Sequence, residues 1–301
     1  MEQVVIFNNI TRPVVDILER LRYDKRYKVI AYHNSQKKIR VKGLDDVTID
    51  DSIDNSESDY VEFMLKQCIE NNVKIFFVLK HRTWIMKQEE KFKDIGVNLI
   101  CESLETLNTV QSKRKTYECL RKSSLLRWYI PWYAKCSNGM DMTELLVNKR
   151  GSNNMVIKLD SNGNKQSYRE IDDSKVDFDT LKEDRINKIN TTEAVHIVAT
   201  ADDVNDLILM EKLDEPVMKA RCIRDKDGKL NITCSKKSDV EYKTIHDICE
   251  KIATALDIKF ACTIHFMYKK EADKEQLKIL GVALGDAYTS AVIRHLLKDL
   301  A

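Results

Sequence analysis

The first hundred residues alternate between apolar runs and amphipathic segments, and this alternation constrains the fold more than any other feature. Runs typical of strands lie at residues 3–7, 27–33, 73–80 and 97–101. Segments with helical spacing lie between them, starting at Thr11 and covering residues 59–72 and 81–96. Because parallel strands need a crossover connection, usually a helix, the pattern predicts a parallel α/β sheet.

This outline is Rossmann-like, but the phosphate fingerprint of dinucleotide-binding proteins is missing. The first strand is followed by FNNITRP, which has no glycine where G-x-G-x-x-G should stand. Those glycines allow the backbone to approach a pyrophosphate, so we do not expect NAD binding.

The remaining two thirds of the chain change character. A helical segment at 103–125 closes the first unit, and a further helix is expected near Met140 and another at 239–257. A polar, loop-rich stretch is expected at 161–190 and a closing helix at the C-terminus. Strands are expected at residues 127–136, 154–160, 206–213, 217–225, 230–236, 259–270 and 276–282.

Composition excludes several classes of function. Fifty basic and 48 acidic residues leave a formal charge of +2, too balanced to predict binding to nucleic acid or to an anionic membrane. No apolar run approaches the roughly 18 residues needed to cross a bilayer, and the N-terminus lacks the basic region of a signal peptide. The eight cysteines form no C-x-x-C pair, so they predict reduced, buried thiols in a cytoplasmic protein.

Five stretches together resemble the ATP-grasp superfamily, in its carbamoyl-phosphate-synthetase-like branch. The resemblance implies a Rossmann-like pre-ATP-grasp domain (residues 1–110), a central ATP-grasp-like lobe (111–190) and a C-terminal lobe (191–301). The stretches are NNITRPVVDILERLRYDKRYKVIAYH, SKRKTYECLRKSSL, MVIKLDSNGNKQSY, LILMEKLDEPVMKARCIRDKDGKL and DICEKIATALDIKFACTIHFMYKK…LKILGV.

The resemblance also implies which residues hold ATP. Lys113 and Lys158 would reach the phosphates, because phosphate groups need cations or bare amides. The backbone of 210–213, which includes Lys212 and Leu213, would form the adenine edge, and Glu211 would accept a hydrogen bond from the adenine amino group. Without the resemblance, we would expect two lysines among fifty basic residues to be solvated at the surface, and a glutamate at the end of a strand to be exposed.

The positions that hold two magnesium ions in this superfamily depart from the pattern. They fall at His265, Ile279 and Gly281, which supply no oxygen ligand, whereas Mg²⁺ prefers oxygen. Residues 276–285 contain no acid, and their one amide is Gln276. The sequence therefore predicts a degraded metal site with no metal ligands assigned.

Three further positions agree with this loss. The phosphate-covering loop keeps one glycine, Gly163, where several are expected. The acid that would hold the ribose falls at Val217, although Glu215 is close enough to compensate. The arginine that follows the metal ligands falls near Ala283.

Two hypotheses remain open. The first is a divergent ATP-grasp-like protein without ligase catalysis, which acts by binding a nucleotide or, more readily, a protein partner. The aromatic cluster at 128–133 is a candidate interface, and a homodimer is compatible with the sequence. The second is an active ATP-dependent carboxylate–amine or carboxylate–thiol ligase that forms an acyl phosphate with rearranged metal ligands. These would be drawn from Asp160, Asp273, Glu275 and Asp286.

Overall fold

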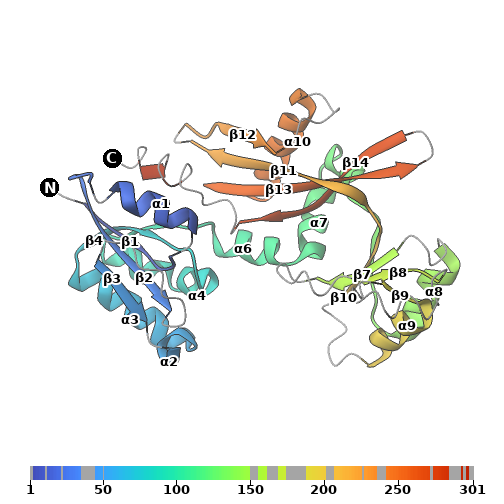
Figure 1. The fold of residues 1–301 in the computed structure, drawn as a ribbon, viewed down its shortest axis with the longest axis horizontal. Coiled ribbons are helices and arrows are strands. Elements are labelled where there is room, and N and C mark those ends of the chain that lie inside the picture. Colours follow the sequence, from blue (N-terminus) through green and yellow to red (C-terminus); the bar gives the residue numbers. More distant parts are fainter. Residues whose placement is uncertain are drawn as a thin grey trace.

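The described part of the chain forms three β-sheets in separate regions of the molecule (Figure 1). Two short helices follow the first sheet in the chain, whereas the second sheet passes directly into the third, from β10 (Leu207–Glu211) to β11 (Asp214–Arg224). The computed structural model describes residues 3–10, 12–21, 23–34, 45–49, 51–149, 155–160, 169–173, 188–200, 207–225, 227–235, 242–271, 274–284, 293, 296 and 297.

The first sheet is parallel, with strand order β3-β2-β1-β4-β5. It confirms the strand–helix alternation predicted for the first hundred residues and adds strand β3, which the sequence pattern missed. Its elements are β1 (Gln3–Phe7), α1 (Arg12–Leu21), β2 (Tyr27–Asn34), β3 (Asp45–Ile49), α2 (Asp51–Asp54), α3 (Glu57–Glu70), β4 (Val73–Phe77), α4 (Arg82–Lys87), α5 (Glu89–Asp94) and β5 (Asn98–Ile100).

The helical segment expected at 103–125 is two helices, α6 (Leu104–Gln111) and α7 (Lys113–Arg121). Ser112 ends α6 in an extended conformation and caps α7, because its hydroxyl accepts a hydrogen bond from the Lys115 backbone N–H. Figure 1 shows both helices between the first sheet and the rest of the molecule. The break at Ser112 therefore places the first turn of α7 where the other two sheets meet.

The second sheet has the order β6-β10-β7-β8-β9. Strand β10 pairs with β6 and β7, so this sheet continues past the domain boundary expected at residue 190. Helices α8 and α9 cover one face of it. Its elements are β6 (Tyr133–Lys135), α8 (Gly139–Lys149), β7 (Met155–Leu159), β8 (Arg169–Ile171), β9 (Lys188–Ile189), α9 (Thr191–Thr200) and β10 (Leu207–Glu211).

The third sheet is antiparallel, with the order β12-β11-β13-β14. Helix α10 packs on the face that carries Cys222, Ile264 and Phe266, and its Cys249 lies beside Cys222. The elements are β11 (Asp214–Arg224), β12 (Leu230–Cys234), α10 (Tyr242–Ala255), β13 (Ala261–Glu271) and β14 (Lys274–Ala283). Of the expected closing helix, the described residues are Ile293, Leu296 and Leu297, which pack against the first sheet.

One expected strand is wrong in its first half. Residues 126–129 form a 3₁₀ helix, η1 (Leu126–Tyr129), and the strand begins only at Tyr133. Pro131 lies between them and has no backbone N–H to donate to a sheet. Trp128, from the predicted aromatic interface, is 68% exposed.

The buried carboxylate of Glu102 connects the first sheet to the third. It follows β5 and accepts hydrogen bonds from the backbone N–H groups of Lys259, Phe260 and Ala261, at 2.7 to 3.1 Å. All eight cysteines are thiols, six of them buried, as the sequence predicted. None of the described helices is long and apolar enough to span a membrane.

Candidate functional site

Two lysines from different elements meet between the second and third sheets. Lys158 lies on β7, on the same face as Val156 and opposite the face that α8 and α9 cover, and it is 6% exposed. Lys113 is the first residue of α7. Burial lowers the pKa of Lys158 to about 7, and the nearby charge of Lys113 acts in the same direction. Such a pair of cations favours an anionic ligand.

Asp160 holds the first turn of α7 against the end of β7. Its carboxylate accepts hydrogen bonds from the Ser112 hydroxyl and from the Arg114 backbone N–H, both at 2.6 Å. Its backbone carbonyl accepts from the Lys113 N–H at 2.9 Å. Burial lowers the pKa of Lys113, and the charge of Asp160 opposes this. Asp160 is thus committed to positioning Lys113, which leaves it poorly placed to serve as a metal ligand.

A β-bulge in β14 separates two of the positions expected to face the site together. His265 pairs with Gly281, whereas the next residue of β13, Phe266, pairs with Ile279. The extra residue is Leu280, whose carbonyl accepts a hydrogen bond from the Tyr117 hydroxyl at 2.8 Å. Ile279 is fully buried in the core. Gly281 remains beside His265 on the face opposite α10.

The ammonium of Lys113 lies beside Gly281. A Cβ atom at Gly281 would be 3.2 Å from Lys113 Nζ, and no other described atom lies within 4 Å of that point outside the neighbouring residues. A side chain at residue 281 would therefore begin in close contact with the ammonium. Because φ of Gly281 is not positive, the glycine provides space rather than a special backbone conformation.

The same face of the third sheet carries polar atoms that the sequence interpretation missed. Arg221 on β11 pairs with Thr263 on β13, which in turn pairs with Ala283 on β14. Arg221 Nε and Thr263 Oγ1 are buried, and neither has a hydrogen-bond partner. Buried polar atoms are nearly always hydrogen-bonded, so these two indicate a polar ligand or ordered water on this face. Strand alternation with Lys219 and His265 is the signal that could have found them.

The end of β10 is fixed by Glu211, which is 4% exposed. One oxygen of its carboxylate accepts from the Trp132 backbone N–H at 2.8 Å, and the other forms an ion pair with Lys269 of β13, also at 2.8 Å. This side chain links the second sheet to the third, so its carboxylate is already engaged. An adenine base would have to use backbone groups here.

The other residues predicted for the adenine edge have different roles. Lys212 forms an ion pair with Glu170 of β8 at 2.5 Å, and Leu213 is buried in the core. Glu215 lies within β11, but its side chain is outside the described part of the structure, as are Asp273 and Asp286. Glu275 is exposed and pairs with Lys270, on the face away from His265.

These residues do not fit a magnesium ion at the end of β14. Mg²⁺ requires hard oxygen ligands in octahedral geometry. The face of the third sheet opposite α10, here called the site face, offers an imidazole at His265 and an ammonium beside Gly281. Ile279 points away from it, into the core. Among the described residues, no group of three acids, histidines or cysteines could hold a metal ion. The cations do fit the phosphate groups of a nucleotide.

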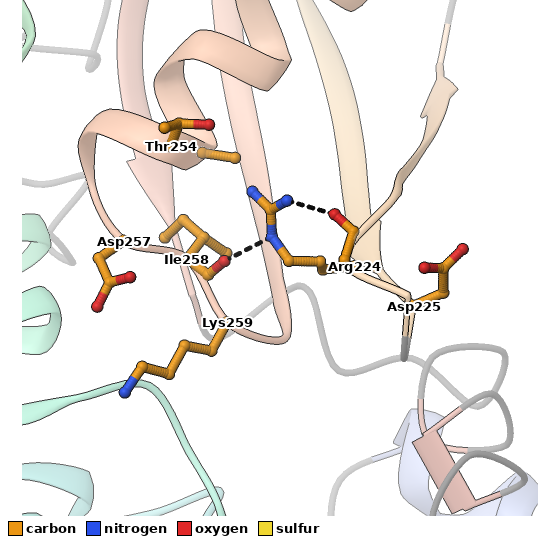
Figure 2. A pocket seen from close by; sticks show the side chains of 8 residues that line it. Arg224, Asp225, Thr254, Asp257, Ile258 and Lys259 are labelled. Carbon is orange, nitrogen blue, oxygen red and sulfur yellow. Dashed lines mark hydrogen bonds between the residues drawn. The ribbon is translucent and has the colours of Figure 1, made fainter.

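A surface groove of about 460 Å³ lies elsewhere, between the β11–β12 turn and the end of α10 (Figure 2). Arg224 donates hydrogen bonds across it, from Nε to the Ile258 carbonyl at 2.9 Å and from Nη1 to the Gly228 carbonyl at 2.6 Å. These bonds close the turn onto α10, so the groove reflects local packing and is separate from the lysine site.

No family model matches the sequence, and no curated protein matches it. Solved structures do match the fold. L-amino acid ligase from Bacillus licheniformis has a TM-score of 0.61 at 15% identity, over 94% of this chain and 66% of the ligase. Biotin carboxylase from Campylobacter jejuni has a TM-score of 0.63 at 15% identity, over 94% of this chain and 65% of the enzyme.

A third structure, N5-carboxyaminoimidazole synthetase from Staphylococcus aureus, was solved with ADP and has a TM-score of 0.63 at 10% identity. The match covers 99% of this chain and 78% of that enzyme. This chain thus spans about two thirds of the length of the first two enzymes. These neighbours are two-lobed ATP-grasp enzymes. The chain has the ATP-grasp fold, with a Rossmann-like first sheet followed by two lobes.

Proposed function

We propose that this protein binds a nucleotide through its phosphate groups, between the second and third sheets, and does not catalyse ATP-dependent ligation. The observation that carries the proposal is the convergence of Lys158 and Lys113 from β7 and α7. Burying an ammonium is costly unless an anion compensates it. A site that keeps Lys158 6% exposed beside a second lysine is therefore arranged for a ligand that brings negative charge.

The rest of the cleft supports a nucleotide as that ligand. Val156 and Met210 lie on the same face of the second sheet as Lys158 and provide apolar surface for a base. The segment after β10 is held in place by Glu211, so its backbone groups are available as a fixed edge. Fold neighbours include enzymes whose structures contain ADP, which is consistent with this assignment.

The electrostatics of phosphoryl transfer support the second half of the proposal, that the protein does not catalyse ligation. In such reactions bound metal ions bridge the phosphate oxygens and neutralise the charge that develops on them. The described residues of β13 and β14 on the site face, from Thr263 to Lys269 and from Gln276 to Ala283, include no carboxylate. Without carboxylates on these described parts of the two strands, the proposed site lacks the usual ligands for the metal ions that supply the dominant electrostatic contribution to catalysis.

Calorimetric titration with ATP and ADP tests the binding, and an assay of ADP release in the presence of mixed amino acids and amines tests the chemistry. We expect both nucleotides to bind, Lys158→Met to weaken binding by about tenfold or more, and ADP release to stay at background. Lys115→Met is the matched control, because Lys115 lies on the exposed side of α7. The proposal fails if neither nucleotide binds, and its second half fails if an amine stimulates ADP release.

A further inference from the structure

We infer that the ammonium of Lys113 takes the place of a divalent cation, so that this site binds a polyphosphate in its metal-free form. The inference rests on the proposed nucleotide function and specifies its ligand. It concerns the end of β14, where Lys113 Nζ lies beside Gly281.

The first support is the space that the ammonium occupies. Lys113 Nζ lies 3.2 Å from the point where a Cβ of residue 281 would stand. Any side chain at 281, including an amide or acid that could hold a metal, would begin in contact with that nitrogen. The glycine therefore leaves room for the lysine to come close to this strand, and a larger residue at 281 would press on the ammonium.

The second support is that the ammonium is fixed in this place. Lys113 follows the capping residue Ser112, and its N–H is bonded to the Asp160 carbonyl at 2.9 Å. The Asp160 carboxylate also holds the next residue, Arg114, through its backbone N–H. The first turn of α7 is thus anchored to β7, and Lys113 is directed from this turn to Gly281.

The third support is the sign of the surrounding charge. Lys113 is close enough for its charge to lower the pKa of Lys158, so two ammonium groups lie near each other. Arg221 lies on the same face of the third sheet as Gly281, and its Nε has no hydrogen-bond partner. Asp160 is a nearby carboxylate, but both of its oxygens accept hydrogen bonds, from Ser112 and from Arg114. The cations would repel a divalent cation placed here and attract a fully charged phosphate chain. A magnesium–nucleotide complex carries two fewer negative charges than the free nucleotide and should bind more weakly.

Calorimetric titration of the full chain with ATP, first in excess EDTA and then in saturating Mg²⁺, tests the inference. For the wild type we expect metal-free ATP to bind about tenfold or more tightly than the magnesium complex. Lys113→Met should weaken metal-free binding by at least this factor and largely remove the difference between the two conditions. Lys115→Met should leave both affinities unchanged.

A second variant keeps the test independent of the loss of a lysine. Gly281→Asp would place a carboxylate against Lys113, and only the flexible end of the lysine would have to move. We expect it to weaken metal-free binding and to make binding depend on Mg²⁺. Urea unfolding of each variant checks that it is folded.

The outcomes separate the two proposals. If the wild type binds ATP only with Mg²⁺, or binds it more tightly with Mg²⁺, the metal-replacement role of Lys113 is wrong, but nucleotide binding stands. If Lys113→Met keeps the preference for metal-free ATP, the role also fails. If ATP binds under neither condition, the proposed function itself is overturned.

Discussion

Replacing Lys158 by methionine should stabilise the ligand-free protein while weakening its binding of nucleotide by about tenfold or more. Methionine has a similar length and no charge, so it fills the same space on β7 without a buried ammonium. Lys158 is only 6% exposed, and most substitutions at buried positions destabilise a protein. A gain here would identify Lys158 as a residue kept for its ligand rather than for folding.

The magnitude follows from the pKa of Lys158. Burial, together with Lys113, lowers it from the ordinary 10.5 to about 7. At ~1.4 kcal/mol per pH unit, this corresponds to about 5 kcal/mol of lost stability below pH 7. Relaxation of the side chain and entry of water reduce the cost, so we expect the variant to be about 2–4 kcal/mol more stable at pH 6.

The sign of the pH dependence is also fixed. The unfolded chain holds the Lys158 proton up to its ordinary pKa, whereas the folded protein releases it near pH 7. Stability of the wild type therefore rises with pH between about 7 and 10.5 relative to the variant, and the full cost of the charge is present below pH 7. The advantage of the variant should shrink by more than half between pH 6 and pH 9.5.

Urea unfolding at pH 6 and pH 9.5, followed by circular dichroism, measures both effects. Lys115→Met, which removes an exposed charge, should change stability by less than about 0.5 kcal/mol at either pH. If Lys158→Met is neutral or destabilising at pH 6, or if its effect is the same at both pH values, the reasoning about a buried, uncompensated ammonium is refuted.

Two further predictions concern the supports of the site. Asp160→Ala removes two 2.6 Å hydrogen bonds at the start of α7 and should cost about 2–4 kcal/mol in urea unfolding. Glu118 is exposed, so Glu118→Ala should change the free energy of unfolding by less than about 0.5 kcal/mol. A similar loss of stability in both variants would contradict the capping role of Asp160. Tyr117→Phe leaves the Leu280 carbonyl without its 2.8 Å hydrogen bond and should cost about 1–2 kcal/mol. An unchanged midpoint of urea unfolding in Tyr117→Phe would show that the β-bulge does not need this hydrogen bond.

The sequence determined the order of the elements, because apolar periodicity depends on neighbouring residues. It determined the parallel first sheet, most of the later strands and the lack of carboxylates between 276 and 285. It misjudged features where local signals compete, such as the 3₁₀ helix before Pro131 and the break between α6 and α7 at Ser112. The pairing of β10 with β7, across the boundary expected at residue 190, is a long-range contact that no local pattern shows.

Only the tertiary structure decided what each site residue contacts. The ammonium of Lys113 reaches Gly281, 168 positions along the chain, only because α7 is anchored by Asp160 and β14 carries a bulge at Leu280. That bulge turns Ile279 into the core, whereas regular alternation would have placed it on the same face as Gly281. Side-chain chemistry is written in the sequence, but its convergence depends on strand register and helix placement, which arise from packing between distant segments.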